Sequence, residues 1–486
     1  MLSLSFLILI AAQEWPQFRG PAGTGIAAAG VKAPTEFAPG KNQLWKIAVP
    51  SGHSSPAVWG SRIFLTAFDK DRKMLEVMAV DRRDGKILWQ KDVPAAAIEK
   101  VHEFSSPATA TPALDGERVY VYFGSTGLHS FDVDGKLLWS VPLPVAQAAF
   151  GSGTSPILAG ENVILSRDEG KEPYLLAVDR KTGQEVWKQK QYRGERGFGF
   201  GHATPVLWKD SLVMHRQGEV VGFDPKTGER KWWIKAMTQG NCTPSPGADA
   251  LYVGTWMNMG EEELRVPLPS FEELLKLHDK DGDGKLSKDE FPTNIQMTRR
   301  VDLEGVPGAA MFLGKWVLGP YYDTNKDGFL EAGEWTKLLG EFAKPREHGL
   351  IAIQPGGDGD LTETNIAWKE PKGVPEIPSP LESGDRVYAV TNGGIVTALE
   401  AKTGKLIYRG RLGAGGGYFS SPVAADGKVY FASAEGVISV VAPGERLKVI
   451  ARNDLGEPIY ATPAIVDNKI YVRTSGHLYA FGDTAK

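Results

Sequence analysis

One short segment recurs along the chain and limits what the chain can fold into. Residues 177–187 read AVDRKTGQEVW, and related copies occupy residues 79–89, 222–232 and 398–408, with a shortened copy at 131–139. Each copy has an apolar run, an acid, a polar turn that contains Gly, and then, in most copies, a Trp. The Gly supplies the positive φ of a tight hairpin, and Asp and Thr bond to the nearby backbone. A segment that recurs at about forty residues indicates supersecondary units that stack on their neighbours, with the aromatic packing against the next copy.

A second periodic mark is a Ser or Thr followed by Pro. The middle of an apolar strand follows each mark at the same distance. Pro is tolerated at the first residue of a strand, where its missing N–H does no harm. Constant spacing after each mark predicts eight units of four short strands. The marks are Pro56, Pro112, Pro156, Pro205, Pro244, Pro380, Pro422 and Pro463.

The last unit contains only three strands, which end near Phe481. A single strand around Trp45 precedes the first mark and has no local partners. We predict that this strand completes the last unit and closes a ring, because closure removes the open sheet edges that invite aggregation. The expected fold is an all-β, eight-bladed β-propeller.

The Asp-x-x-Thr-Gly-x-x-x-Trp repeats resemble the tryptophan-docking repeats of the pyrroloquinoline quinone (PQQ)-like β-propeller family. That family includes quinoprotein alcohol dehydrogenases and the propeller lipoprotein of the outer-membrane barrel assembly machine. The opening residues 15–25, WPQFRGPAGTG, are similar to those of bacterial PQQ-like repeat proteins. The resemblance covers nearly everything outside residues 259–348. It implies the fold and leaves the function open, because this fold hosts both enzymes and scaffolds.

The repeat spacing is interrupted between Pro244 and Pro380. Inside this interval the apolar period changes from two to that of a helix, with Phe271, Leu274, Leu275 and His278 on one face. We predict a small α-helical insertion at residues 259–348 in the fifth blade. The propeller then comprises residues 13–258 and 349–486.

Two segments of the insertion resemble EF-hand calcium loops. Oxygen side chains at positions 1, 3 and 5 reach the ion, Gly at position 6 permits the bend, the carbonyl of position 7 is a ligand, and Glu at position 12 binds through two oxygens. Two complete matches in tandem disfavour the alternative of two solvated acidic turns. The predicted ligands of two Ca²⁺ sites are Asp279, Asp281, Asp283, Lys285 (carbonyl) and Glu290 in the first loop, and Asp323, Asn325, Asp327, Phe329 (carbonyl) and Glu334 in the second.

Three further features of these loops lead to expectations. Ser287 and Glu331 at position 9 act through water in such loops. Leu286 and Leu330 at position 8 are expected to pair the loops across a short ladder. Residues 319–320, Gly-Pro, shorten the helix before the second loop, so we expect that site to bind calcium more weakly.

Composition limits the partners and the compartment. A net charge of −4 provides no basic field for nucleic acid. The single cysteine, Cys242, excludes an internal disulfide and a cysteine metal cluster, and we predict a small buried side chain there. Residues 1–12, MLSLSFLILIAA, are similar to a secretory signal cleaved before Gln13, which predicts export to the periplasm or beyond. No other run approaches membrane-spanning length.

The family resemblance raises the question of a quinone in the central channel. PQQ carries three carboxylates, so the resemblance implies basic side chains, a stacking Trp and usually a metal. The adjacent Cys pair of the family's alcohol dehydrogenases is absent, and we expect no PQQ. His53, His102 and His202 each lie shortly before a marked strand. They could form a metal or catalytic cluster, although polar side chains in a wet channel are favoured.

Three other sequence features do not indicate a binding site. The Gly-rich residues 192–201 and 413–418 are not followed by a helix, which argues against nucleotide binding. Residues 358–360, Asp-Gly-Asp, are expected to form a hairpin tip. The sequence therefore favours an exported, calcium-binding propeller, a monomer that binds or scaffolds a protein or polymer. The alternative is a periplasmic quinoprotein-type oxidoreductase, or a hydrolase, that uses the channel, and no catalytic residue is assigned.

Overall fold

The computed structural model describes residues 14–148, 150–170, 172–191, 201–257, 261–300, 310–319, 321–344 and 347–483. Two compact units divide the chain: Met1–Trp256 with Gly349–Lys486, and Met257–His348. The predicted signal at residues 1–12 and its cleavage site lie outside the described residues.

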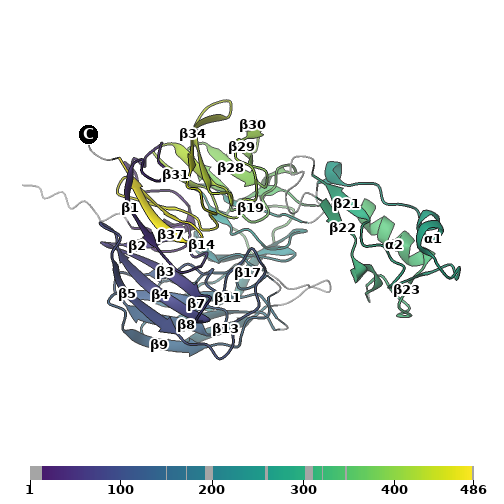
Figure 1. Cartoon of the computed structure of the whole chain (residues 1–486), viewed down its shortest axis with the longest axis horizontal. Helices are drawn as coiled ribbons and strands as arrows, with labels where there is room; N and C mark the ends of the chain where they lie inside the picture. Colours follow the sequence, from purple (N-terminus) through teal and green to yellow (C-terminus); the bar gives the residue numbers. More distant parts are fainter. Residues whose placement is uncertain are drawn as a thin grey trace, which may run out of the picture. The chain divides into compact units, whose positions relative to one another are not determined.

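The first unit contains eight sheets, each built on four antiparallel strands, which confirms the predicted eight-bladed propeller (Figure 1). Blades one to four are formed by β2 (Ala57–Trp59), β3 (Arg62–Asp69), β4 (Met74–Asp81) and β5 (Ile87–Val93); β6 (Ala113–Leu114), β7 (Arg118–Phe123), β8 (Gly127–Asp132) and β9 (Leu137–Pro142); β10 (Ile157–Ala159), β11 (Asn162–Arg167), β12 (Tyr174–Asp179) and β13 (Glu185–Lys190); and β14 (Val206–Trp208), β15 (Ser211–Arg216), β16 (Glu219–Phe223) and β17 (Arg230–Lys235).

Blades five to eight follow the same plan, with the insertion between the second and third strands of blade five. They are formed by β18 (Ser245–Pro246), β19 (Leu251–Gly254), β24 (Leu350–Ile353) and β26 (Ile366–Glu370); β27 (Leu381–Ser383), β28 (Arg386–Thr391), β29 (Ile395–Glu400) and β30 (Leu406–Arg411); β31 (Val423–Ala425), β32 (Lys428–Ala432), β33 (Val437–Ala442) and β34 (Lys448–Asp454); and β35 (Ala464–Val466), β36 (Lys469–Arg473), β37 (His477–Gly482) and β1 (Gln43–Ala48).

The Pro marks set the register between the first two strands of every blade. In blade one, Ala57 follows Pro56 and pairs with Phe64 of the next strand. The pair has the same spacing in the other seven blades, from Ala113 with Tyr120 to Ala464 with Tyr471. A constant register keeps the same side chains buried in each blade, because a one-residue slip would turn them outward.

At five junctions between blades, the recurring Trp packs on the turn of the next blade. The ring of Trp187 in blade three covers Gly228 in the turn of blade four, where a Cβ would lie 2.5 Å from the indole. That Gly has φ 72°, so the turn needs Gly for conformation as well as for space. Four further pairs repeat this contact and confirm that the aromatic packs against the next copy: Trp45 with Gly85, Trp89 with Gly135, Trp139 with Gly183 and Trp368 with Gly404.

Blades four and five are joined by a different set of contacts. Trp232 donates its indole N–H to Ser211 Oγ of its own blade at 3.1 Å. The expected hairpin tip between β24 and β26 carries a strand, β25 (Gly359–Asp360), which pairs in parallel with β17 of blade four. Lys235 Nζ lies 2.7 Å from Asp360 Oδ2 at this contact. The tip therefore also adds a fifth strand to the neighbouring sheet, which the sequence did not predict.

The ring closes as predicted. Strand β1 lies beside β37 (Figure 1) and pairs with it antiparallel. Trp45 is opposite Ala480. The Trp45 side chain is buried, and its ring centroid lies 6.1 Å from that of Tyr471. The first and last described strands thus share one blade.

The segment before β1 crosses the ends of several innermost strands. It contains one short 3₁₀ helix, η1 (Pro21–Gly23), and otherwise isolated bridges. Trp15 bridges to Val58 of blade one, and Ile26 bridges to Ala424 of blade seven. The Leu114 N–H of blade two donates to Pro16 O at 2.8 Å. The segment therefore lies across one face of the propeller.

The second unit has its own hydrophobic core, in which Leu274, Phe291, Leu330 and Trp335 are buried together. The helix before its second loop is only a 3₁₀ turn, as the Gly319 position predicts. Its elements are η2 (Glu262–Leu264), α1 (Phe271–His278), β20 (Leu286–Ser287), β21 (Gln296–Arg299), β22 (Ala310–Phe312), η4 (Lys315–Leu318), β23 (Phe329–Leu330) and α2 (Ala332–Ala343).

Candidate metal centre

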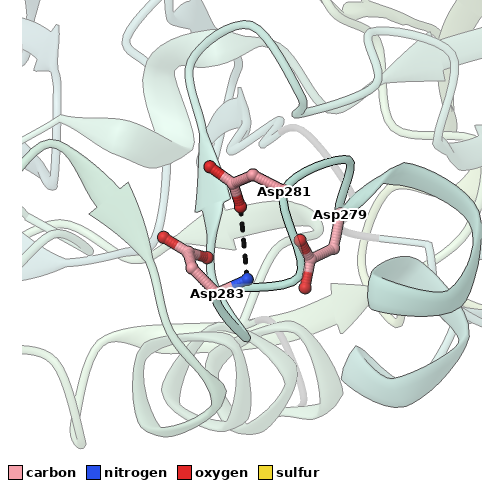
Figure 2. Close-up of side chains that lie close together, drawn as sticks. All are labelled: Asp279, Asp281 and Asp283. Atoms are coloured by element: carbon pink, nitrogen blue, oxygen red, sulfur yellow. Dashed lines mark hydrogen bonds between the residues drawn. The ribbon is translucent and has the colours of Figure 1, made fainter.

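The first loop begins where α1 ends and holds three carboxylates around one turn, as Figure 2 shows. One oxygen from each of Asp279, Asp281 and Asp283 lies within 4.8 Å of the others. The N–H of Gly282 donates to Asp279 Oδ1 at 2.7 Å, and the N–H of Gly284 donates to Oδ2 at 3.0 Å. Asp279 therefore fixes the turn that brings the other two acids to the same space.

Glu290 closes the first loop from its far end. The N–H of Lys280 donates to Glu290 Oε1 and that of Ser287 donates to Oε2, both at 2.9 Å. These backbone donors, first that of Ser287, lower the pKa of Glu290 to about 2. The carboxylate is therefore ionised at neutral pH and joins the two ends of the loop.

The second loop repeats this scheme at the equivalent positions. The N–H of Gly328 donates to Asp323 Oδ2 at 3.0 Å. The N–H of Thr324 donates to Glu334 Oε1 at 2.7 Å, and that of Glu331 donates to Oε2 at 3.2 Å. Asp323 and Glu334 are both buried. The same backbone donors hold the same two acids in both loops, so the loops share one conformation.

The residues at position 7 also match. Lys285 donates its N–H to Asp283 Oδ1 at 2.8 Å, and Phe329 donates its N–H to Asp327 Oδ1 at 2.9 Å. In the second loop the side-chain amide of Asn325 donates to Asp327 Oδ2 at 3.2 Å. All ten predicted ligand residues thus lie in these two loops.

The two loops are joined through a two-stranded ladder. Leu286 pairs with Leu330 and Ser287 with Phe329, which confirms the predicted ladder. Both leucine side chains are fully buried. The loops are therefore held side by side by backbone pairing and by a shared core.

One feature of the pair was not predicted from the sequence. The side chain of Lys285 leaves the first loop and reaches the second, where Nζ lies 3.1 Å from Asp327 Oδ2 and 2.5 Å from Glu331 Oε1. Hydrogen bonds to Glu331 and Asp327 raise the pKa of Lys285. Sequence reasoning considered Lys285 only for its carbonyl and missed the contact, because the loop motif does not specify where this side chain points.

The donor chemistry of both loops fits calcium. The predicted ligands are carboxylates, one amide and backbone carbonyls, and Ca²⁺ takes six to eight such oxygens in flexible geometry. In the second loop a cation, the Lys285 ammonium, already contacts two of the acids. The arrangement is therefore suited to a hard divalent cation.

The three histidines do not form a metal cluster. His53 stacks on Tyr460 with ring centroids 4.5 Å apart, and Phe150 lies 5.2 Å from His102 and 6.0 Å from His202. Burial lowers the pKa of His53 to about 3 and also lowers that of His202. Within the described part of the chain, Asp279, Asp281 and Asp283 are the group of acids, His or Cys whose ligand atoms could hold one ion. The histidines instead pack against aromatic rings, which the sequence did not predict.

The basic side chains near these histidines already have partners. Arg473 donates to Pro50 O at 3.0 Å and Thr66 O at 2.8 Å. Arg216 Nη2 lies 2.8 Å from Asp168 Oδ1, and Arg167 is paired with Glu169. A quinone with three carboxylates needs several cationic side chains, and these three arginines are already engaged with oxygen acceptors of the protein.

Cys242 is fully buried, as predicted. Its thiol donates to Gly254 O at 3.3 Å, and burial raises its pKa to about 12. The residue is therefore a neutral part of the core.

Comparison with known families agrees with this geometry. A family model described as "Outer membrane protein assembly factor BamB" matches residues 73–243 and 347–480, more than half of the chain. The chain belongs to this PQQ-like propeller family. An EF-hand model matches residues 271–293 and 321–339, which include both loops completely.

Solved structures share the fold. BamB from Moraxella catarrhalis has a TM-score of 0.53 and 15% identity, covering 91% of this chain and 98% of its own. A europium-containing methanol dehydrogenase has a TM-score of 0.57 and 13% identity, with coverage of 97% and 98%. Identities this low show the fold alone.

One curated relative matches in sequence. A quinohemoprotein alcohol dehydrogenase from Comamonas testosteroni is 26% identical over 137 residues, which is 25% of this chain and 19% of that protein. The match thus spans about a fifth of the relative's length. None of the described helices has the length and apolar content needed to cross a membrane.

Proposed function

We propose that this chain is an exported calcium-binding propeller that acts as a binding or scaffolding protein. The observation that carries the proposal is the pair of loops in which the same backbone donors hold the same acids, as at Asp279 and Glu290. Calcium occupies both loops and offsets part of the negative charge of their carboxylates. Export is supported by the apolar run at residues 1–12.

Calcium orders the insertion in this proposal. Without the ion, the carboxylates of each loop repel one another and oppose the compact pair. An ion that binds only the folded form stabilises it by RT ln(1 + [Ca]/Kd), about 2.7 kcal/mol at a hundredfold excess over Kd. The partner is a protein or polymer held by the propeller, and it is neither a nucleic acid nor a second copy of the chain. The family match to an assembly factor supports this class of partner.

Calorimetric titration of the full chain tests the calcium sites. We expect two sites in the parent and strong loss of the first in Glu290→Gln, which keeps the shape but removes the charge. Glu334→Gln should weaken the second site in the same way. Asp289→Asn is the matched control, because its side chain is 96% exposed and lies outside the ligand set. Absence of calcium uptake at millimolar concentration would refute the assignment, and pull-downs with and without calcium then test the partner.

The alternative is a periplasmic quinoprotein-type oxidoreductase that uses the channel. The likeness to the Comamonas testosteroni quinohemoprotein alcohol dehydrogenase favours it. Reconstitution with PQQ and calcium, followed by dye-linked oxidation of alcohols or sugars, separates the two. We expect no activity, since Arg167, Arg216 and Arg473 are already engaged. A stoichiometric quinone complex with substrate-dependent dye reduction would establish the oxidoreductase instead.

A further inference from the structure

The Ser or Thr before each marked Pro takes part in a ring of hydrogen bonds, which we name the hydroxyl belt. The backbone N–H of this residue in one blade donates to the hydroxyl of its counterpart in the next blade, at 2.9–3.1 Å. The belt explains why Ser or Thr precedes each marked Pro, because these residues supply the hydroxyl that accepts the hydrogen bond. Its seven links are Ser55 to Thr111, Thr111 to Ser155, Ser155 to Thr204, Thr204 to Thr243, Ser379 to Ser421, Ser421 to Thr462 and Thr462 to Ser55.

The hydroxyl belt is interrupted between blades five and six. Ser379 is 1% exposed, and its hydroxyl has no hydrogen-bond partner. The seven other hydroxyls of the belt each accept a backbone N–H. Buried polar groups are nearly always hydrogen-bonded, so an unpaired hydroxyl at this position requires an explanation.

The guanidinium of Arg19 lies at this interruption. Arg19 is fully buried, and its Nη2 donates to Pro380 O at 2.7 Å, one residue from Ser379. Nη2 also lies 3.1 Å from Ser245 Oγ in the innermost strand of blade five and 3.2 Å from Thr24 O. The other two nitrogens, Nε and Nη1, have no partner. The segment that crosses the propeller thus places a cation where the hydroxyl belt is open.

No acid among these neighbours balances the Arg19 charge. Its hydrogen-bond acceptors are neutral, and the one ionisable group that acts on it electrostatically is Cys242. That thiol is protonated, because burial raises its pKa to about 12. Burial lowers the pKa of Arg19 to about 9, so the guanidinium keeps its charge at neutral pH. A buried charge without a counter-charge is strongly unfavourable.

A second buried arginine shows what a purely structural guanidinium looks like in this fold. Arg473 is also buried and has no acid partner. Its Nη1 lies 2.6 Å from Ser54 Oγ and 2.8 Å from Thr66 O, and its Nη2 lies 3.0 Å from Pro50 O. Only Nε of Arg473 lacks a partner, whereas both Nε and Nη1 of Arg19 lack one.

We propose that the interruption of the hydroxyl belt binds a small monovalent anion, a halide or a carboxylate, between Arg19 and Ser379. Arg19 Nε and Nη1 and the Ser379 hydroxyl offer donors, and the guanidinium supplies the opposite charge. A cation is disfavoured by the same charge. The site is separate from the calcium loops and does not depend on the proposed function.

Anomalous diffraction from crystals of the full chain grown in bromide tests the site directly. We expect a bromide peak within hydrogen-bonding distance of Arg19. In solution, urea unfolding is followed at constant ionic strength while chloride, bromide or formate replaces gluconate, a much bulkier anion. Above Kd, each tenfold rise in the free concentration of the anion that binds should raise the folding equilibrium constant about tenfold. A response to formate but not to halides identifies the ligand as a carboxylate.

Variants assign the response to this site. Arg19→Met has a similar length and no charge, so the anion dependence should vanish. Ser379→Ala should weaken the dependence with little effect on folding, which keeps the test available if Arg19→Met does not fold. Arg83→Met is the control. The Arg83 side chain is 79% exposed, so its removal should leave the dependence of stability on the anion unchanged. Water in place of bromide at Arg19, or equal anion dependence in the parent and both site variants, would overturn the proposal.

Discussion

The stability of the propeller should fall as pH rises towards neutrality, because of one buried carboxyl group. Glu99 is 4% exposed and accepts hydrogen bonds at 2.9 Å from the N–H and the hydroxyl of Ser152, both at Oε2. Its other oxygen, Oε1, has no partner. Burial raises the pKa of Glu99 to about 7.

The sign and size of the effect follow from proton linkage. Between the ordinary pKa of 4.5 and the folded pKa of about 7, the folded state keeps a proton that the unfolded state has lost. The stabilising effect is therefore complete below pH 4.5 and is lost as pH rises through 7. In this interval the free energy of unfolding falls by about 1.4 kcal/mol for each pH unit. Over the whole interval it falls by roughly 3 kcal/mol.

Glu99→Gln removes this dependence, since the amide stays neutral and still accepts from Ser152. Urea unfolding of the parent and the variant, followed by Trp fluorescence at pH 5 and pH 8, measures the difference. Other titrating groups contribute equally to both proteins and cancel. The parent should lose more stability than the variant between the two pH values. Parallel stability profiles would show that Glu99 is ionised already at pH 5 and would refute the reasoning.

Three further outcomes are expected. Lys285→Met should raise the calcium affinity of the second loop about two- to fivefold, because it removes a weak, exposed ion pair that competes with the ion. Calorimetric titration measures the affinity, and Lys288→Met should show no such gain. Trp45→Ala should destabilise the propeller by about 3–5 kcal/mol in chemical unfolding, whereas Leu44→Ala, at an exposed neighbour, should cost far less. Gly228→Ala should destabilise more than Gly160→Ala, because both have positive φ but only Gly228 lies under an indole ring; equal melting temperatures would contradict this packing.

The propeller was predictable because its repeats specify local backbone geometry. Pro marks the start of an innermost strand, and Gly228 and its equivalents need both a positive φ and an open face beneath Trp. The Pro, Gly and Trp that meet these requirements can be recognised within the sequence of a single repeat. The closure by Trp45 followed from a strand without local partners, and the loop ladder followed from the position of Leu286 and Leu330.

The features that the sequence did not reveal all depend on contacts between distant residues. Arg19 reaches Ser245 and Pro380, which lie hundreds of residues away. Strand β25 pairs with β17 from another blade. The histidines pack against rings such as Tyr460 from other repeats. No local pattern encodes such partners, so the interrupted hydroxyl belt and the contacts of the histidines with aromatic rings could be found only in three dimensions.

Because β1 pairs with β37, the last blade can be completed only after both strands have been synthesised. Lys46 pairs with Tyr479, near the other end of the chain. At about 5–20 residues per second, roughly 20 to 90 seconds separate the appearance of the two strands. During that time the first strand made has no partner in its own blade, and the seven complete blades form an arc with two open edges. Such long-range pairing is slow, so ring closure is expected to be a late step in folding. Among the strands of the propeller, the one synthesised first is thus the last to find its partner.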